Sequence, residues 1–187
     1  MDVGVLAVRY AKALLGYARD EGVAEKVYTL SDRVLQCFAQ NPTLSAALED
    51  PLLSSEEKLK LLSTIASGDG GKEGVVMLRY FSLMIEKRRE AYLASSLRSY
   101  MDLYRKSEGI VVVKIITAVP LEKEMEDKIL SRVSSMLGKR IELQKSVDPS
   151  IEGGFIFDID DYRLDASVAS RLRQIRRQLI DKNRRIV

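Results

Sequence analysis

The sequence predicts an α+β fold, with an N-terminal six-helix bundle over residues 1–108 and a small C-terminal α+β domain over residues 109–187. Three observations lead to this prediction. Apolar residues recur every three or four positions through the first hundred residues, which is the period of a helix that buries one face. From Gly109 onward β-branched residues dominate, and around Phe155 the side chains alternate with a period of two, as strands prefer. Proline and glycine stand where the elements must end.

Six segments of the N-terminal part have helical periodicity, and short connections join them. They cover residues 6–17, 27–38, 42–50, 54–65, 75–85 and 93–104. Asn41 offers an N-cap to the third segment, Pro42 suits its first turn and Pro51 ends it. Ser54 and Glu57 form a capping box for the fourth segment. Because no strand signal precedes residue 109, we expect these helices to pack together as a bundle.

The first helix carries more apolar residues than one buried face needs, since a surface helix normally shows a single apolar stripe. One interpretation is a central helix that its own bundle buries on all sides. The other is that one face packs inward and the opposite face receives a partner helix. Alanines at positions 7, 11 and 18 would allow a close backbone approach, and Tyr10 and Tyr17 suit an interface because tyrosine is half polar. Periodicity alone leaves both interpretations open.

The C-terminal part changes from helices to alternating strands and helices. Strands are predicted over residues 110–116, 141–147, 155–159 and 162–164, and helices over residues 121–137 and 168–179. Pro120 ends the first strand, and Gly138 suits the C-terminal end of the first helix. The last helix places Val168, Leu172 and Ile175 on one face, with arginines elsewhere. This order predicts a small domain in which one face of the sheet is covered.

The run GGFIFDIDDYRLDASV, residues 153–168, raises the question of a metal or catalytic site. Each of its features also has a local structural explanation. The pair Gly153-Gly154 supplies a bend or bulge at the strand entry. Asp158 and Asp160 lie together on the strand face opposite Phe155, while Asp161 occupies the turn. Asp165 and Ser167 precede a helix, where either side chain can accept a free backbone N–H. We therefore interpret the motif as structural, with neither metal nor catalysis.

Composition removes most catalytic chemistries. The chain has no histidine and one cysteine, Cys37, so zinc sites and Ser-His or Cys-His nucleophiles are excluded. An enzyme would have to rely on carboxylates, lysine or tyrosine. The glycine-rich stretch at residues 68–71 lacks the GK[ST] ending of a phosphate-binding loop and is interpreted as a connector. No stretch is long and apolar enough to span a bilayer, and the N-terminus shows no secretory or transit pattern. A single cysteine suits a reducing compartment.

The last helix is basic and offers an alternative function. Its arginines, which follow an acidic segment, are Arg171, Arg173, Arg176, Arg177, Arg184 and Arg185. Such a cluster is typical of a nucleic-acid footprint. It is equally typical of a solvated helix face opposed by its own acidic hairpin. The helix has no aromatic residue to stack on bases, and no RNA-binding motif precedes it. Binding to RNA or to the ribosome is therefore kept as the alternative to a protein-binding role.

Three stretches together resemble one family. RYAKALLGYA at residues 9–18 resembles the opening helix of the delta subunit of the F-type ATP synthase, whose mitochondrial counterpart is the oligomycin-sensitivity-conferring protein. NPTLSAALEDPLLSSEEKLKLL is similar to its third and fourth helices. The segment GGFIFDIDDYRLDASVASRLRQIRRQL, residues 153–179, is similar to its C-terminal signature, to which Gly153, Gly154, Asp165 and Ser167 belong. The end of the fifth helix reads IEKRRE, where the family more often has a Glu-Asn turn.

The resemblance implies a non-catalytic subunit of the peripheral stalk, without cofactor or metal, present once per complex. Its N-terminal bundle would hold N-terminal helices of alpha subunits in a groove between the first and fifth helices. By position this implicates Tyr10, Leu14, Tyr17, Arg79 and Leu83. Its C-terminal domain would hold the C-terminal end of the b-subunit stalk, so that the complex resists rotor torque. The subunit would lie at the cytoplasmic face of a bacterial cell membrane, attached only through the complex and binding no nucleic acid.

Overall fold

The computed structural model describes residues 3–66, 71–159 and 162–184. The chain forms two compact units, residues 1–107 and 108–187. The first unit is helical in its described residues, and the second combines helices with a four-stranded sheet. The predicted α+β class is therefore confirmed. The glycine-rich connector before Gly71 and the turn at Asp160 and Asp161 lie outside the described residues.

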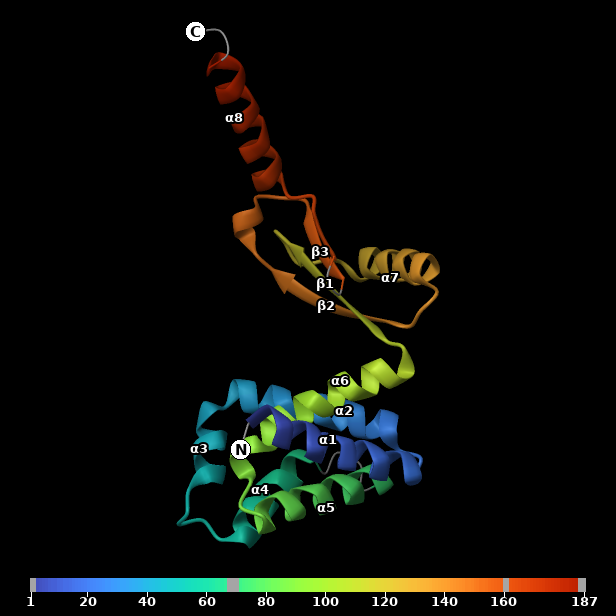
Figure 1. The fold of residues 1–187 in the computed structure, drawn as a ribbon, viewed down its shortest axis with the longest axis vertical. Helices are drawn as coiled ribbons and strands as arrows, with labels where there is room; N and C mark the ends of the chain where they lie inside the picture. Colours follow the sequence, from blue (N-terminus) through green and yellow to red (C-terminus); the bar gives the residue numbers. More distant parts are fainter. Residues whose placement is uncertain (1–2, 67–70, 160–161, 185–187) are drawn as a thin grey trace. The chain divides into compact units, whose positions relative to one another are not determined.

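The N-terminal unit consists of short helices that pack around a shared core (Figure 1). Their bounds are α1 Val3–Asp20, α2 Ala24–Gln40, α3 Pro42–Glu49, α4 Ser55–Ala66, α5 Lys72–Glu86, the 3-10 helix η1 Glu90–Tyr92, and α6 Leu93–Glu108. The second helix packs against α1, α3, α4 and α5, and α5 also packs against α1 and α4. These two helices therefore form the centre of the unit.

Buried apolar side chains of several helices meet in this core. Phe81 and Met77 of α5, Leu62 of α4 and Tyr100 of α6 are all fully buried. The Tyr100 hydroxyl donates to the carbonyl oxygen of Ala24 at 2.8 Å, which satisfies a polar group that burial would otherwise leave without a partner. Burial raises the pKa of the Tyr100 phenol above its ordinary value. The core therefore contains a hydrogen-bonded tyrosine packed among apolar side chains.

The ends of two helices test the capping predictions. Glu57 N–H donates to the Ser54 hydroxyl at 3.3 Å, and the Glu57 carboxylate accepts from Ser54 N–H at 2.9 Å, which is the predicted capping box. These hydrogen bonds lower the pKa of Glu57. Asn41 behaves differently from the prediction. Its side chain makes no cap hydrogen bond to α3 and instead donates to the Cys37 carbonyl at the end of α2, at 3.1 Å.

A buried ion pair and a left-handed residue shape the turn after α5. Lys58 of α4 contacts Glu90 of η1 at 3.0 Å, and both side chains are largely buried. Arg88 has φ 52°, in the left-handed region that Asn or Gly adopts more readily. The backbone N–H of Arg89 donates to the Met84 carbonyl at 2.8 Å, which closes the end of α5. The IEKRRE turn therefore holds an arginine in a backbone conformation that glycine or asparagine adopts with less strain.

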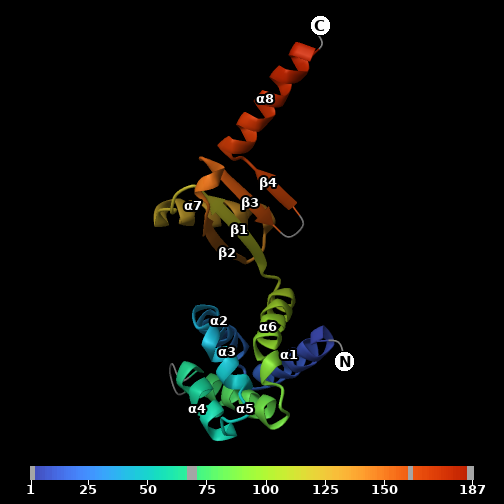
Figure 2. The ribbon, with the colours of Figure 1, turned by 90° about the vertical axis from the view of Figure 1, so that its left-hand side faces the viewer.

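The C-terminal unit is built on a mixed sheet with the order β2-β1-β3-β4 (Figure 2). Its elements are β1 Val111–Thr117, α7 Lys123–Leu137, β2 Ile141–Val147, the 3-10 helix η2 Pro149–Ile151, β3 Phe155–Ile159, β4 Tyr162–Asp165 and α8 Val168–Arg184. The parallel strands β1 and β2 are joined through α7, and β3 pairs antiparallel with both β1 and β4. All four predicted strands and both predicted helices are present.

One face of this sheet is only partly covered. Val113 and Ile115 of β1 are buried, and the strand pairing places them on the same face as Phe157 and Ile159. Helix α7 packs on β2, yet none of its residues is buried. Val168 at the start of α8 and the next apolar residues on its stripe remain 43–53% exposed. The predicted cover of one sheet face is therefore only partial, because α8 leaves the sheet instead of lying on it.

We expect residues 1–108 to fold without the rest of the chain, because their apolar residues meet in a core of their own. A fragment ending at Glu108 should unfold cooperatively on heating. The loss of its helical circular dichroism signal in the far ultraviolet would follow this transition. Limited proteolysis of the full chain should release a fragment that ends near Gly109, which has φ 64°. A fragment with a broad, non-cooperative transition would contradict this boundary.

Candidate functional site

Helix α1 has one buried face and one accessible side. Its buried residues are Leu6, Ala7, Ala11, Leu14, Leu15 and Ala18, each at most 9% exposed. The small alanines let α1 approach the core of its own unit, so they do not form a surface for a partner. Leu14 is 2% exposed for the same reason. The prediction that Leu14 lines a partner-binding groove is therefore wrong, since a partner cannot reach a core side chain.

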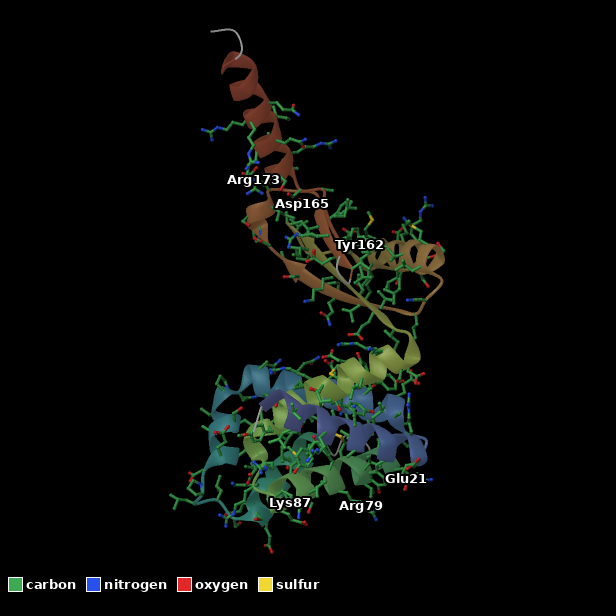
Figure 3. The ribbon with its side chains drawn as sticks, in the orientation of Figure 1. Glu21, Arg79, Lys87, Tyr162, Asp165 and Arg173 are labelled. Carbon is green, nitrogen blue, oxygen red and sulfur yellow. The ribbon has the colours of Figure 1, made fainter. Side chains whose placement is uncertain are left out.

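Tyr17 and Arg79 bridge α1 and α5 at the surface. Arg79 Nη1 donates to the Tyr17 hydroxyl at 2.7 Å, and its guanidinium carbon lies 5.9 Å from the centre of the Tyr17 ring. Figure 3 shows Arg79 on the outer side of α5. Leu83, one turn further along α5, is 37% exposed, and Val75, one turn earlier, is 49% exposed. We call Tyr10, Tyr17, Val75, Arg79 and Leu83 the α1–α5 surface.

Tyr10 lies at the inner edge of this surface. It is half-buried and close enough to Tyr80 of α5 to influence its ionisation. Burial raises the pKa of Tyr80 to about 12, the hydrogen bond to Ser96 opposes this shift, and Tyr10 adds to it. Tyr80 is therefore a neutral hydrogen-bonding group at neutral pH. The α1–α5 surface consequently combines apolar side chains, phenols and one cation.

The opposite flank of α1 also exposes apolar side chains, which sequence reasoning did not separate from the rest. Val5 is 58% exposed and Val8 is 38% exposed, and they line a shallow hollow with Gly4, Arg9 and Lys12. At 100° per residue these valines fall on a different side of the helix from Tyr10 and Tyr17. A helical-wheel count could have distinguished the two flanks.

The C-terminal signature residues hold the junction between the hairpin and α8. Gly154 has φ 75°, and a Cβ there would lie 2.3 Å from the carbonyl oxygen of Ala166. Only glycine fits this close approach in a left-handed conformation. Gly153 accepts from Val168 N–H at 3.0 Å through its carbonyl. The paired glycines therefore seat the start of α8 against the start of β3.

Ser167 and Asp165 close the first turn of α8. The Ser167 hydroxyl accepts from Ser170 N–H at 3.2 Å, which is the geometry of an N-cap. Asp165 accepts from Ser167 N–H at 3.0 Å and from the Ser170 hydroxyl at 2.6 Å. These hydrogen bonds lower the pKa of Asp165 to about 2. Both side chains therefore accept hydrogen bonds from backbone N–H groups at the start of α8. Figure 3 shows Asp165 at this junction.

Asp158 lies among cations rather than on a free strand face. It pairs across the sheet with Lys114 of β1 and with Arg163 of β4, whose Nε lies 3.6 Å from its carboxylate. Its side chain is 30% exposed. Asp158 lies on the strand face opposite Phe155, as predicted, and Arg163 lies beside it on that face. Asp160, its predicted neighbour, lies outside the described residues.

An apolar groove between α7 and the β3–β4 hairpin was not predicted. Its volume is about 740 Å³, and Ile129, Val133 and Leu137 of α7 face Phe157 and Leu164 across it. Strand alternation shows to which sheet face Phe157 belongs but not whether another element covers that face. We call this feature the hairpin groove.

The structure describes the side chains of four arginines of α8, and all four are exposed: Arg171, Arg173, Arg176 and Arg177. The side chains of Arg184 and Arg185 lie outside the described part of the chain. Over residues 3–66, 71–159 and 162–184, no three acidic or sulfur side chains gather in a way that could hold a metal ion. Within the same ranges, no helix combines the length and apolar character needed to cross a bilayer.

Comparison with known proteins identifies the family. The family model described as ATP synthase delta (OSCP) subunit matches residues 6–179. The chain belongs to this family. The ATP synthase subunit delta of Bacteroides thetaiotaomicron is 46% identical over the full length of both chains. The protein of the same name from Flavobacterium johnsoniae is 36% identical, over 92% of this chain and 96% of its own.

A solved structure agrees with the fold. A chain of the mitochondrial ATP synthase hexamer of Toxoplasma gondii superposes with a TM-score of 0.66, over 94% of this chain and 97% of its own, at 23% identity. The delta (OSCP) subunit is a structural component of the peripheral stalk of the F-type ATP synthase. Our chain is therefore part of that complex, and the family resemblance seen in its sequence is confirmed.

The N-cap of α8 can be tested with Ser167→Ala. Ser167 is 2% exposed, so water cannot replace its hydroxyl at the Ser170 N–H. Loss of an N-cap costs about 0.5–2 kcal/mol of unfolding free energy. Hydrogen exchange of the backbone amides of β1 to β4, followed at increasing urea concentrations, should show this loss in the C-terminal unit. Ser135→Ala on the exposed side of α7 is the matched control and should change nothing measurable.

Asp165 should make the stability of the C-terminal unit depend on pH. Its folded-state pKa of about 2 lies below the ordinary value of 3.8, so the ionised form stabilises the fold. This contribution is fully present above pH 3.8 and is lost as the pH falls through about 2. Wild type should therefore melt at a higher temperature than Asp165→Asn near neutral pH, and the difference should shrink through this window. A difference that stays constant would show that ionisation of Asp165 is not involved.

Proposed function

We propose that this subunit joins the catalytic head of the ATP synthase to the membrane-anchored stalk without catalysing a reaction itself. Its six N-terminal helices would act as one bundle that holds N-terminal helices of alpha subunits. Its C-terminal unit would hold the C-terminal end of the b subunit. One copy per complex, at the cytoplasmic face of a bacterial membrane, would resist the torque of the rotor. Membership in the family and the two separate compact units support this proposal.

The α1–α5 surface is the observation on which the alpha-binding role rests. It offers exposed aliphatic side chains at Val75 and Leu83, beside a cation that Tyr17 holds in place. An amphipathic helix can bury its apolar side chains on such a surface, and its polar edge can bond to the phenol and the guanidinium. Because Tyr17 already holds the Arg79 side chain in one conformation, binding a partner would cost less side-chain entropy. Tyr10, Tyr17, Arg79 and Leu83 are therefore retained as candidate contacts, and Leu14 is not.

Co-purification tests the proposed function as a whole. Tagged protein should carry alpha and b subunits from detergent-solubilised membranes of the source cells. Repeating the wash at low and at high salt separates this role from RNA binding through α8. Contacts to phosphates weaken steeply with salt, whereas helix packing on an apolar surface does not. Retention of RNA at low salt only, without alpha or b subunits, would contradict the proposal.

Leu83→Asp should weaken the binding of an alpha N-terminal peptide while the bundle stays folded. Placing a carboxylate in an interface costs at least about 2 kcal/mol when no partner satisfies it, which is roughly a thirtyfold rise in Kd. Leu61→Asp on α4 is the matched control, because Leu61 is 40% exposed and Leu83 is 37% exposed. Titration calorimetry with both variants gives the comparison. Equal affinities for the two would remove Leu83 from the alpha-binding surface.

A further inference from the structure

Helix α8 extends away from the rest of its unit (Figure 1). Its first turn is held at the end of the hairpin by the hydrogen bonds among Asp165, Ser167 and Ser170. Beyond this turn, every side chain from Arg171 to Gln178 is exposed, which amounts to about two turns of helix. Among the described residues, no element therefore covers this stretch on any side (Figure 2).

A helix in this position lacks the packing that normally stabilises helices. Isolated helices of fewer than about 15 residues are marginal in water, and most helices in proteins are stabilised by burying one apolar face. Helix α8 has 17 residues, yet Val168, Leu172 and Ile175 remain 43–53% exposed. We call these three residues the α8 stripe. A surface outside the unit is needed to cover it.

The arginines of α8 border the α8 stripe on both sides. At about 100° per residue, the stripe occupies an arc of about 60° on the helix. Arg171 lies about 40° beyond one edge of this arc, and Arg176 lies about 40° beyond the other edge. Arg173 and Arg177 fall on the opposite face. All four side chains are exposed, so an apolar line and a positive charge are presented together.

The acids of the hairpin do not neutralise this charge. Asp165 accepts hydrogen bonds from the first turn of α8, and Asp158 lies 3.6 Å from Arg163 of β4. Arg173 donates to the neutral Ser170 hydroxyl at 2.9 Å. In the part of the chain that the structure describes, no carboxylate pairs with the exposed arginines of α8. The last twenty residues of the sequence carry seven basic residues and one acidic residue, so the positive charge is unbalanced.

We propose that α8 binds the surface of an anionic lipid membrane while the subunit is not yet assembled. The α8 stripe would lie at the level of the upper acyl chains, and the arginines would contact the headgroups. Such a surface supplies an apolar layer and negative charge together, which are the two properties that α8 requires. The stems of Arg171 and Arg176 can lie along the apolar layer while their guanidinium groups stay at the headgroups.

Two other occupants fit α8 less well. RNA would pair with the arginines but would leave the α8 stripe in water, and residues 168–178 contain no aromatic side chain to stack on bases. A second copy of α8 would cover the stripe, but it would place arginine against arginine along both borders. The proposal goes beyond the proposed function and does not rest on it, because it concerns the subunit outside its complex.

The test uses the full-length protein and vesicles of two compositions. One kind contains equal parts of phosphatidylglycerol and phosphatidylcholine, and the other contains phosphatidylcholine alone. Sedimentation with the vesicles should show an affinity at least about tenfold higher for the anionic kind, because its surface attracts the arginines. Added salt should weaken this binding through screening. The helical circular dichroism signal should increase on binding, because the interface stabilises α8.

Matched variants locate the contact on α8. Leu172→Gln should lower the affinity for anionic vesicles about tenfold, because it removes an apolar side chain from the interface. Arg176→Gln should lower it about fivefold, the contribution of one cation near an anionic surface. Leu61→Gln on α4 and Arg98→Gln on α6 are the controls and should bind as wild type does. All four positions are exposed, and circular dichroism without vesicles checks that each variant keeps the fold.

Three results would overturn the proposal. Equal affinity for both kinds of vesicle, or no binding to either, would show that anionic lipid does not attract α8. If Arg176→Gln weakens binding and Leu172→Gln does not, the arginines adhere by charge alone and the α8 stripe takes no part. If polyuridylate binds more tightly than the anionic vesicles and Leu172→Gln leaves its affinity unchanged, α8 is an RNA contact instead. Co-purification of alpha and b subunits is independent of all three results, so the proposed function is tested separately.

Discussion

The close packing of α1 against its own core is the constraint on which the N-terminal unit depends. Ala7, Ala11 and Ala18 are at most 2% exposed, so the backbone of α1 approaches its neighbours without large side chains between them. Leu6, Leu14 and Leu15 share this buried face, and the other large residues lie at its edges. Tyr10 and Tyr17 meet α5 on one side, and Val5 and Val8 reach solvent on the other. The same packing that stabilises the unit thus determines which side chains a partner can touch.

The two units differ in how completely they bury their apolar side chains. In the N-terminal unit, fully buried side chains such as Phe81 and Leu62 meet around α2 and α5, and buried hydroxyls such as that of Tyr100 find backbone partners. The C-terminal unit buries β1 well but leaves α7 and the hairpin half covered. A sheet with so much accessible apolar area gains stability when a further element covers it. The stability of the second unit therefore depends more on what covers its sheet than the stability of the first unit does.

The sequence predicted the elements well and their surroundings less well. Local signals such as the Ser54–Glu57 capping box and the Gly138 helix end depend on neighbouring residues, and each appears as expected. Burial depends on what packs from elsewhere in the chain. Leu14 and Tyr17 share a helical stripe, yet one is in the core and the other is at the surface. Neither the ion pairing of Asp158 nor the hairpin groove can be read from periodicity, because both arise from strand order.

The single cysteine of the chain is a natural site for attaching a fluorescent label. Cys37 is partly accessible on α2, and it belongs neither to the α1–α5 surface nor to the hairpin groove. Because the sequence has no second thiol, a maleimide fluorophore would react at one known place without any engineered substitution. Energy transfer from that dye to one on an assembled neighbour would report how the stalk flexes while the enzyme turns over.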